Sequence, residues 1–329
     1  MKPETIKKSY KMDTNTEHKY RIIEHGSVPR HDFHQFIVGA IGPRPIAFVS
    51  TVDKDGNPNL APYSFFNAFS SNPPIFVFSS NRRATNNTVK DTLSNVREVP
   101  EVVINAVNFP IVRQMAVASA QFDKGVNEFV KSGLTPMPAD LVRPFRVKES
   151  PISMECKVTD IITLGDQGGA GHLIIVEMLR MHVREDVLDE KGRIVPDKLD
   201  LMGRLGRAYY VRASGSAIYT IAQAIEQPCI GFDSLPKSIL ESHVFSANNL
   251  GQFAGLYAVP TQAEVEELRN TDARLQAAIA SQNPLDAIHR YAKEVLERDE
   301  ESRPLAGKIA WAGEWLAGNG EEVQTAAGS

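Results

Sequence analysis

The stretch that decides the fold runs from residue 43 to residue 80 and reads PRPIAFVSTVDKDGNPNLAPYSFFNAFSSNPPIFVFSS. It contains a short apolar, partly β-branched run at 45–52 and a second run at 59–64, separated by the polar turn 53–56. Asp-Gly between two such runs is typical of a β-hairpin, because glycine tolerates the positive φ that a tight turn requires. A third strand is predicted at 75–79, so the stretch indicates antiparallel β structure.

β patterns continue further along the chain. A fourth strand is predicted at 101–107, two longer strands at 153–164 and 172–183, and a short one near 208–211. Helical spacing of apolar residues is confined to two segments between these strands, 87–96 and 111–120. Hairpins with few interspersed helices favour a barrel or sandwich over a doubly wound parallel sheet. The fold class expected is mainly β with added helices (α+β).

The chain changes character at about residue 228, where helical patterns take over. Thr261 and Glu264 form the pattern of a capping box, and an apolar stripe with helical spacing continues to Ile279. Asn283 followed by Pro284 indicates a second helix start, and 302–316 forms a third helical segment. We therefore expect four regions: a disordered tail at 1–19, a β domain at 20–227, a helical extension at 228–318 and a disordered tail at 319–329.

Composition excludes several classes of protein. The 329 residues are 42% hydrophobic and 23% charged with a formal net charge of −4, so no basic surface for nucleic acid is expected. No apolar run is long enough to span a bilayer, and the polar N-terminus does not resemble a signal peptide. Cys156 and Cys229 lack CxxC spacing, and His31 and His34 are expected at the surface, so no metal site is predicted. A reducing cytoplasm is the expected compartment.

Several motifs in order resemble the flavin reductase-like FMN-binding split-barrel family. They are the opening stretch, VKDTLSNV at 89–96 and EVVINAV at 101–107, and the similarity runs from about residue 20 to residue 211. The resemblance implies an FMN-binding split β-barrel, here with an added C-terminal helical extension, and a homodimer. It also implies that NADH or NADPH binds without a G-x-G-x-x-G loop, which the sequence lacks.

The resemblance implies which residues hold the flavin phosphate. Lys90, Asp91 and Thr92 match the family's KDT motif, and Arg82 is a second candidate cation. A lysine supplies charge and a threonine hydroxyl supplies a further donor, as phosphate binding requires. The alternative for KDT alone is a solvated helix start.

The resemblance further assigns a segment along the flavin, with hydroxyl groups nearby. The residues carried over for these contacts are Thr51, Tyr63, Ser64, Phe65, Phe66, Asn67, Ser79 and Ser80. Ser64 and Asn67 suit hydrogen bonds to the ribityl chain or the ring. The alternative for Phe65 and Phe66 is that they only fill the core.

Two later matches concern the reaction itself. His172 aligns with a histidine near the flavin and nicotinamide of related reductases, where it would orient substrate or donate a proton. A lone histidine at a strand start is otherwise a satisfied polar residue. Arg204 and Tyr209 fall in a segment that resembles the family's closing motif, although Arg207 stands where many relatives have a second glycine.

Three functions remain open from the sequence. The first is an NAD(P)H:flavin reductase that supplies reduced FMN to a partner monooxygenase. The second is an enzyme that retains FMN and acts on an organic substrate, such as a nitroaromatic acid. The third is a non-catalytic flavin-binding or electron-transfer module, because a fold does not fix a function.

Overall fold

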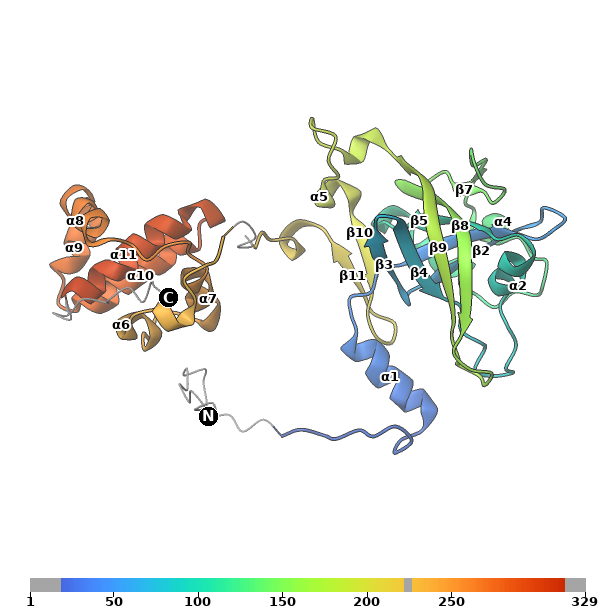
Figure 1. Ribbon diagram of the computed structural model, residues 1–329, viewed down its shortest axis with the longest axis horizontal. Helices are drawn as coiled ribbons and strands as arrows, with labels where there is room; N and C mark the ends of the chain where they lie inside the picture. The colour runs from blue at the N-terminus through green and yellow to red at the C-terminus, as the bar shows by residue number, and fades with distance from the viewer. Residues whose placement is uncertain (1–18, 222–226, 317–329) are drawn as a thin grey trace, which may run out of the picture. The chain divides into compact units, whose positions relative to one another are not determined.

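A computed structural model describes residues 19–221 and 227–316. It divides the chain into two compact units: a barrel unit of residues 22–219, and a helical unit with its described elements between residues 227 and 316 (Figure 1). The division falls at 219/220, whereas the sequence predicts it at 227/228. The predicted tail at 319–329, and that at 1–19 except for Lys19, lie outside the described residues.

The barrel unit is built on antiparallel strands (Figure 1). Their bounds are β1 Ala47–Val52, β2 Pro58–Tyr63, β3 Phe66–Ser71, β4 Pro74–Ser79, β5 Glu101–Ala106, β6 Pro136–Met137, β7 Arg146–Val147, β8 Ile152–Thr163, β9 His172–Val183, β10 Leu201–Arg204 and β11 Tyr210–Ala213. Over the described part of the chain, seven of them form one sheet in the order β2-β1-β5-β8-β9-β4-β3. The pairs β6–β7 and β10–β11 form separate two-stranded sheets.

The long strands β8 and β9 join the two halves of the sheet. β8 pairs with β5 through 153–157, and β9 pairs with β4 through 173–177, while the two strands pair with each other from 152 to 183. Two register shifts in the β8–β9 pair lie near Cys156 and Asp160. Bulges of this kind bend a sheet and increase its twist, which allows the two halves to enclose a core. The predicted mainly β, antiparallel fold with added helices is confirmed.

β1 lies at the centre of this packing and is buried on both faces. Ala47 and Val49 face a core shared with Phe78, Ile174 and other residues of the enclosed sheet. Phe48 belongs to a second core, which α3 and α4 cover from the other side. Alternate residues of a strand point to opposite faces, so one six-residue strand supports both cores.

The helices of the barrel unit are short. They are α1 Arg30–Ala40, α2 Asp91–Glu98, α3 Val112–Ala118, α4 Glu128–Ser132 and α5 Pro196–Leu199. α2 begins at Asp91 rather than near the predicted Asn87, because Asn87 has a φ of 57° and Lys90 is extended. α1 was not predicted.

Strand β3 was also missed by the sequence prediction. It follows β2 after only two residues and pairs with β4 across the turn at 72–73. Its residues are mostly exposed, so the strand shows no apolar alternation that would reveal it. The strand predicted near 208–211 lies slightly later, as β11, and pairs with β10.

The helical unit contains α6 Lys237–Leu240, α7 Ala247–Ala254, α8 Gln262–Thr271, α9 Ala273–Ile279, α10 Pro284–Leu296 and α11 Arg303–Leu316 (Figure 1). The capping box of Thr261 and Glu264 is present at the start of α8. The predicted continuous stripe is divided at Asp272, whose carboxylate accepts hydrogen bonds from two N–H groups of α9. Asn283 occupies the N-cap of α10, but its side chain makes no capping hydrogen bond.

The helices of this unit pack around their own apolar core. Ile239, Phe253, Leu275 and Ile288 are completely or almost completely buried there. Among the described residues, no helix combines the length and the apolar character needed to cross a bilayer.

Candidate functional site

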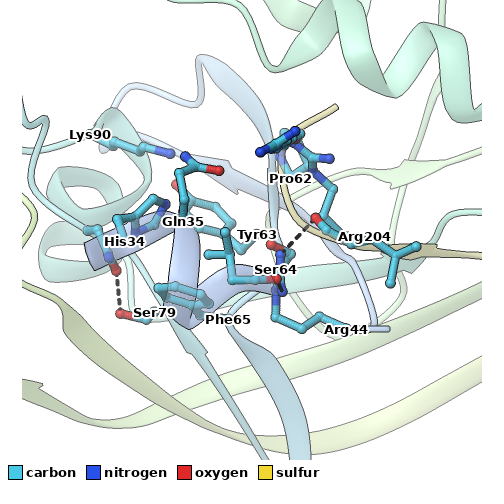
Figure 2. Close-up of a pocket in the computed structure, with 14 residues that line it drawn as sticks. His34, Gln35, Arg44, Pro62, Tyr63, Ser64, Phe65, Ser79, Lys90 and Arg204 are labelled. Atoms are coloured by element: carbon cyan, nitrogen blue, oxygen red, sulfur yellow. Dashed lines mark hydrogen bonds between the residues drawn. The ribbon is translucent and has the colours of Figure 1, made fainter. Parts of the chain in front are cut away.

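A basic cavity lies where α1, the end of β2, the end of β4 and the β10–β11 turn meet (Figure 2). We call it the central cavity, and its volume is about 260 Å³. The lining residues are His34, Gln35, Val38, Arg44, Pro62, Tyr63, Ser64, Phe65, Ser79, Asn81, Lys90, Arg204, Leu205 and Arg207. These come from six separate stretches of the chain, so the cavity exists only in the folded protein.

Two further cavities adjoin the central one through shared residues. A polar cavity of about 140 Å³ shares Pro62, Tyr63 and Lys90 with it and is also lined by Asn59, Arg83, Asp91, Thr92 and Glu128. An apolar cavity of about 410 Å³ shares Phe65, Ser79 and Asn81 with it and is also lined by Phe66, Asn67, Phe69, Val77, Leu164 and Leu173. The three cavities therefore change from polar to apolar along the ends of β2 and β4.

The charges around the central cavity have one sign. Its described lining includes Arg44, Lys90, Arg204 and Arg207 but neither Asp nor Glu. The Nζ of Lys90 lies 4.8 Å from the centre of the Tyr63 ring, and no ion pair involves this lysine within the described chain. Burial lowers the pKa of Lys90, and the positive charge of the neighbouring Arg83 lowers it further. A cation held without a carboxylate partner is suited to an anionic ligand.

Arg44 is almost fully buried and supports the wall of the cavity. Its Nη1 donates to the Val38 carbonyl oxygen at 2.6 Å and to that of Ile41, and its Nη2 donates to the Leu205 carbonyl oxygen at 3.2 Å. The backbones of Arg44 and Arg204 also exchange two hydrogen bonds of 2.9 and 2.8 Å. Arg44 thus ties the end of α1 to the β10–β11 turn.

Several buried polar atoms near the cavity have no hydrogen-bond partner among the described residues. They include Gln35 Oε1, the Tyr63 hydroxyl and Ser80 Oγ. Burial raises the pKa of Tyr63 to about 12, so its hydroxyl stays protonated at neutral pH. The hydroxyl approaches Thr92 and Ser80 but forms no hydrogen bond of good geometry with either. Because buried polar groups are normally paired, these atoms fit partners from a bound ligand.

The structure brings most of the predicted cofactor residues to this site. Tyr63, Ser64, Phe65, Ser79, Lys90 and Arg204 line the central cavity, Phe66 and Asn67 the apolar cavity, and Asp91 and Thr92 the polar cavity. The site assignments themselves stay predictions.

Four of the predicted cofactor residues do not line these three cavities. Thr51 is fully buried, and its Oγ1 accepts hydrogen bonds from Asn59 at 3.1 Å and Asn95 at 3.0 Å. Ser80 is buried beneath the site, Arg82 donates to the side chain of Asn87 at 2.7 Å, and the exposed Tyr209 lies in the β10–β11 turn.

His172 lies inside the barrel at the start of β9. Its Nδ1 is 3.0 Å from Thr163 Oγ1, and its Nε2 is buried without a hydrogen-bond partner among the described residues. Burial, and then the charges of Arg97 and Arg82, lower its pKa, which favours the neutral ring. The ring lines none of the three cavities, so a ligand in them would not contact it directly. The catalytic role of His172 stays a prediction.

Sequence reasoning missed the following charged and polar residues of the site. Arg83, not Arg82, lies beside Lys90, and His34, Gln35, Arg44 and Arg207 line the central cavity. The sequence offered a signal for two of them: His34 is part of the HDFH pattern, and Arg207 replaces a glycine of the family's closing motif. Nothing local in the sequence indicates that α1 would reach the strand ends.

One group of possible metal ligands exists among the described residues, away from these cavities. Oxygen or nitrogen atoms of Asp140, Glu155 and His182 lie within 4.8 Å of one another. Glu155 is fully buried and accepts hydrogen bonds from the backbone of Asp140 and Leu141, and its Oε1 is 2.5 Å from His182 Nε2. The carboxylate is thus satisfied by the protein itself.

Comparison with known proteins agrees with this architecture. The model of the flavin reductase like domain matches residues 40–204, which all lie in the barrel unit. An uncharacterized protein of Aquifex aeolicus is 39% identical over 182 residues, covering 55% of this chain and 90% of that protein. The chain belongs to the flavin reductase-like family.

Two solved structures have a similar fold. Nitrilotriacetate monooxygenase component B from Bacillus cereus superposes with a TM-score of 0.57 and 31% identity, covering 60% of this chain and 98% of that one. Pseudomonas fluorescens 2-nitrobenzoate 2-nitroreductase superposes with a TM-score of 0.54 and 30% identity, covering 62% and 98%. Family and neighbours together support a flavin-related oxidoreductase with a split-barrel fold.

Proposed function

We propose that the protein is an FMN-dependent oxidoreductase in which NADH or NADPH delivers hydride to the flavin. The observation that carries this proposal is the central cavity, where cationic side chains and aromatic rings meet in a chain of the flavin reductase-like family. Hydride transfer is the chemistry that FMN supplies when it is bound. The protein would bind the flavin and the nicotinamide, orient them for hydride transfer and shield them from water.

The residues present fit the chemical parts of FMN. Lys90 and Arg83, at the junction of the central and polar cavities, would neutralise the phosphate. The unpartnered hydroxyl of Tyr63, which lines the central cavity, would serve as a donor or acceptor for oxygen atoms of the cofactor. Phe65 and the apolar cavity offer a surface for a flat ring system.

Other residues would act on the cofactor's surroundings. Gln35 Oε1 is a buried acceptor without a partner among the described residues. It would accept a hydrogen bond from an N–H group of a ring or a carboxamide. Arg44 holds α1 against the β10–β11 turn and so keeps the cavity wall in place. A fixed wall excludes water and aligns reactants, which is the contribution that hydride transfer needs from a protein.

Two fates of the electrons are consistent with the comparisons. In the first, which we favour, the protein is an NAD(P)H:flavin reductase that passes reduced flavin to a partner monooxygenase, in line with the similarity to a monooxygenase component B. In the second, FMN is retained and reduces an organic substrate such as a nitroaromatic acid, in line with the similarity to a 2-nitrobenzoate nitroreductase. A non-catalytic electron-transfer module is the third possibility.

The visible absorbance spectrum of the purified protein, before and after anaerobic addition of NADH or NADPH, tests the proposal. A flavin spectrum that bleaches supports an FMN-dependent oxidoreductase. If added FMN does not bind, or if bound FMN remains oxidised with both nucleotides, the proposed reaction is wrong. Dependence of turnover on added free FMN then separates the flavin reductase from the enzyme that retains its cofactor.

A homodimer is part of the proposal. Phe69 and Leu164 both line the apolar cavity yet are 68% and 61% exposed. Exposed apolar groups that cluster in this way commonly mark an interface. Sedimentation equilibrium would test the dimer, and a monomer at micromolar concentration would contradict it.

A further inference from the structure

The central cavity carries two separate groups of cations. One is Lys90, with Arg83 beside it; the other comprises Arg44, Arg204 and Arg207. Figure 2 shows Lys90 and Arg204 on opposite sides of the cavity. The causes of the pKa shifts follow the same division. Burial is the larger cause for both residues, and in addition the charge of Arg83 lowers the pKa of Lys90 and the charge of Arg204 lowers the pKa of Arg44.

The second group is held on a rigid support. The Nη1 of Arg204 donates to the Tyr209 carbonyl oxygen at 2.9 Å, and its Nη2 donates to the Arg207 carbonyl oxygen, so Arg204 closes the β10–β11 turn. Gly206 packs on α1 so closely that a Cβ there would lie 3.2 Å from the Cα of Gly39. The turn is therefore fixed against α1, and it presents Arg207 at the cavity.

Arg207 is the cation of this group that the fold does not use. The guanidinium groups of Arg44 and Arg204 donate to backbone carbonyls, whereas no hydrogen bond or ion pair of the Arg207 side chain is present among the described residues. Its φ of 54° lies in the left-handed region, where glycine is favoured over any residue with a Cβ. The position thus holds a free charge in a backbone conformation that gains nothing from a side chain.

We propose that Arg207, supported by Arg204 and Arg44, binds an oxyanion of the molecule that exchanges electrons with the flavin. This inference rests on the proposed function, because FMN carries one phosphate and Lys90 with Arg83 would neutralise it. The second group then serves a second molecule. The oxyanion is a phosphate if that molecule is a nicotinamide dinucleotide and a carboxylate if it is an aromatic acid, since a guanidinium binds either in the same way.

Arg207→Gly is the decisive variant. It removes the charge and also relieves the left-handed backbone, so loss of folding does not explain a loss of binding. Arg207→Lys keeps a charge without the planar fork, and Arg113→Gln removes an exposed charge elsewhere, on α3. FMN affinity of each variant is measured first, by titrating the apoprotein with FMN.

Binding to the FMN-loaded proteins is then followed by the change in flavin absorbance with four probes. These are NAD⁺ with its neutral counterpart nicotinamide, and 2-nitrobenzoate with its neutral counterpart nitrobenzene. We expect Arg207→Gly to raise the Kd of one charged probe about tenfold, with its neutral counterpart and FMN unchanged. An effect on NAD⁺ identifies a phosphate as the oxyanion, and an effect on 2-nitrobenzoate identifies a carboxylate.

Other outcomes overturn the inference. The inference is wrong if Arg207→Gly weakens charged and neutral probes equally, if it affects no probe, or if the wild-type protein binds neither charged probe. It is also wrong if only FMN binding is lost, because Arg207 would then belong to the phosphate site. Failure of the proposed function is visible separately, as wild-type protein that binds no FMN or whose FMN is not reduced by nucleotide.

Discussion

The barrel unit and the helical unit each bury apolar cores of their own but differ in the polar groups that they bury. In the described helical unit the buried polar residues are Asn249 and His289, whereas the barrel unit buries many more, some of them in networks beside the cavities. One such network joins Asn59 to Thr51 at 3.1 Å and to Thr92 at 2.9 Å. Burying polar groups is costly unless they are paired, and this network pairs Asn59 and Thr92 directly beneath the polar cavity that both residues line. In the described helical unit, a cavity of about 760 Å³ is lined by Ser242, Asp286 and His289, but few polar residues are buried around it.

Substitutions in the two apolar cores should give the largest losses of unfolding free energy. Ile288→Ala in the helical unit and Ile174→Ala in the barrel unit both truncate fully buried side chains. Each should lower the free energy of unfolding of its own unit by about 2–5 kcal/mol. Thermal unfolding followed by circular dichroism and, for the barrel, by release of FMN should show each variant shifting one transition. A single transition that moves equally in both variants would mean that the two units unfold together.

The buried histidine of the helical unit should make that unit sensitive to acid. Burial lowers the pKa of His289 to about 4 from an ordinary value of 6.5, despite the opposing charge of Asp286, and its Nδ1 is 2.9 Å from Ser242 Oγ. Because the folded-state pKa is the lower one, stability is complete above about pH 6.5 and falls as the pH decreases toward about 4. The gap corresponds to roughly 3 kcal/mol.

His289→Gln tests this, because glutamine does not titrate. Denaturant unfolding at several pH values should show a flatter dependence between pH 6.5 and 4 than in the wild type. The exposed His243, which is paired with Asp286 at 2.8 Å, provides the control variant His243→Gln. An unchanged slope in His289→Gln would show that another group carries the acid sensitivity.

Removal of the Lys90 charge should weaken the flavin site without affecting the helical unit. Lys90→Ala should raise the Kd for FMN about 10- to 100-fold, because a charge-assisted hydrogen bond to phosphate contributes about 1.5–3 kcal/mol. Arg83→Ala should weaken FMN binding less, and Arg82→Ala should have the smallest effect, because Arg83 lines the polar cavity and Arg82 lines none of the three cavities. Fluorescence titration of apoprotein with FMN measures all three. A larger loss for Arg82→Ala would restore the sequence-based assignment.

The smallest effect concerns helix capping in the helical unit. Thr261→Ala removes a capping box at the start of α8 and should cost about 1 kcal/mol of unfolding free energy. Asn283→Ala, at an N-cap whose side chain makes no capping hydrogen bond, is the matched control and should cost less. Equal losses in chemical denaturation would show that the Asn283 side chain caps α10 in solution.

Local patterns were sufficient for much of the fold. The hairpin of β1 and β2, the long strands β8 and β9, and the helix start at Thr261 are each encoded within a few neighbouring residues, through alternation, turn chemistry or capping. The ordered motifs between residues 43 and 107 also sufficed to indicate the family. The exposed strand β3 escaped because its side chains carry no apolar period.

Only the tertiary structure decided which side chains form the site. The central cavity joins His34 of α1 to Lys90 and Arg207, which are 56 and 173 positions further along the chain. Sequence alone also could not choose between Arg82 and Arg83, because the choice depends on which of the two side chains the folded loop places at the polar cavity. Secondary structure follows from interactions between near neighbours, whereas a binding site is made by side chains that become neighbours only when the cores have packed.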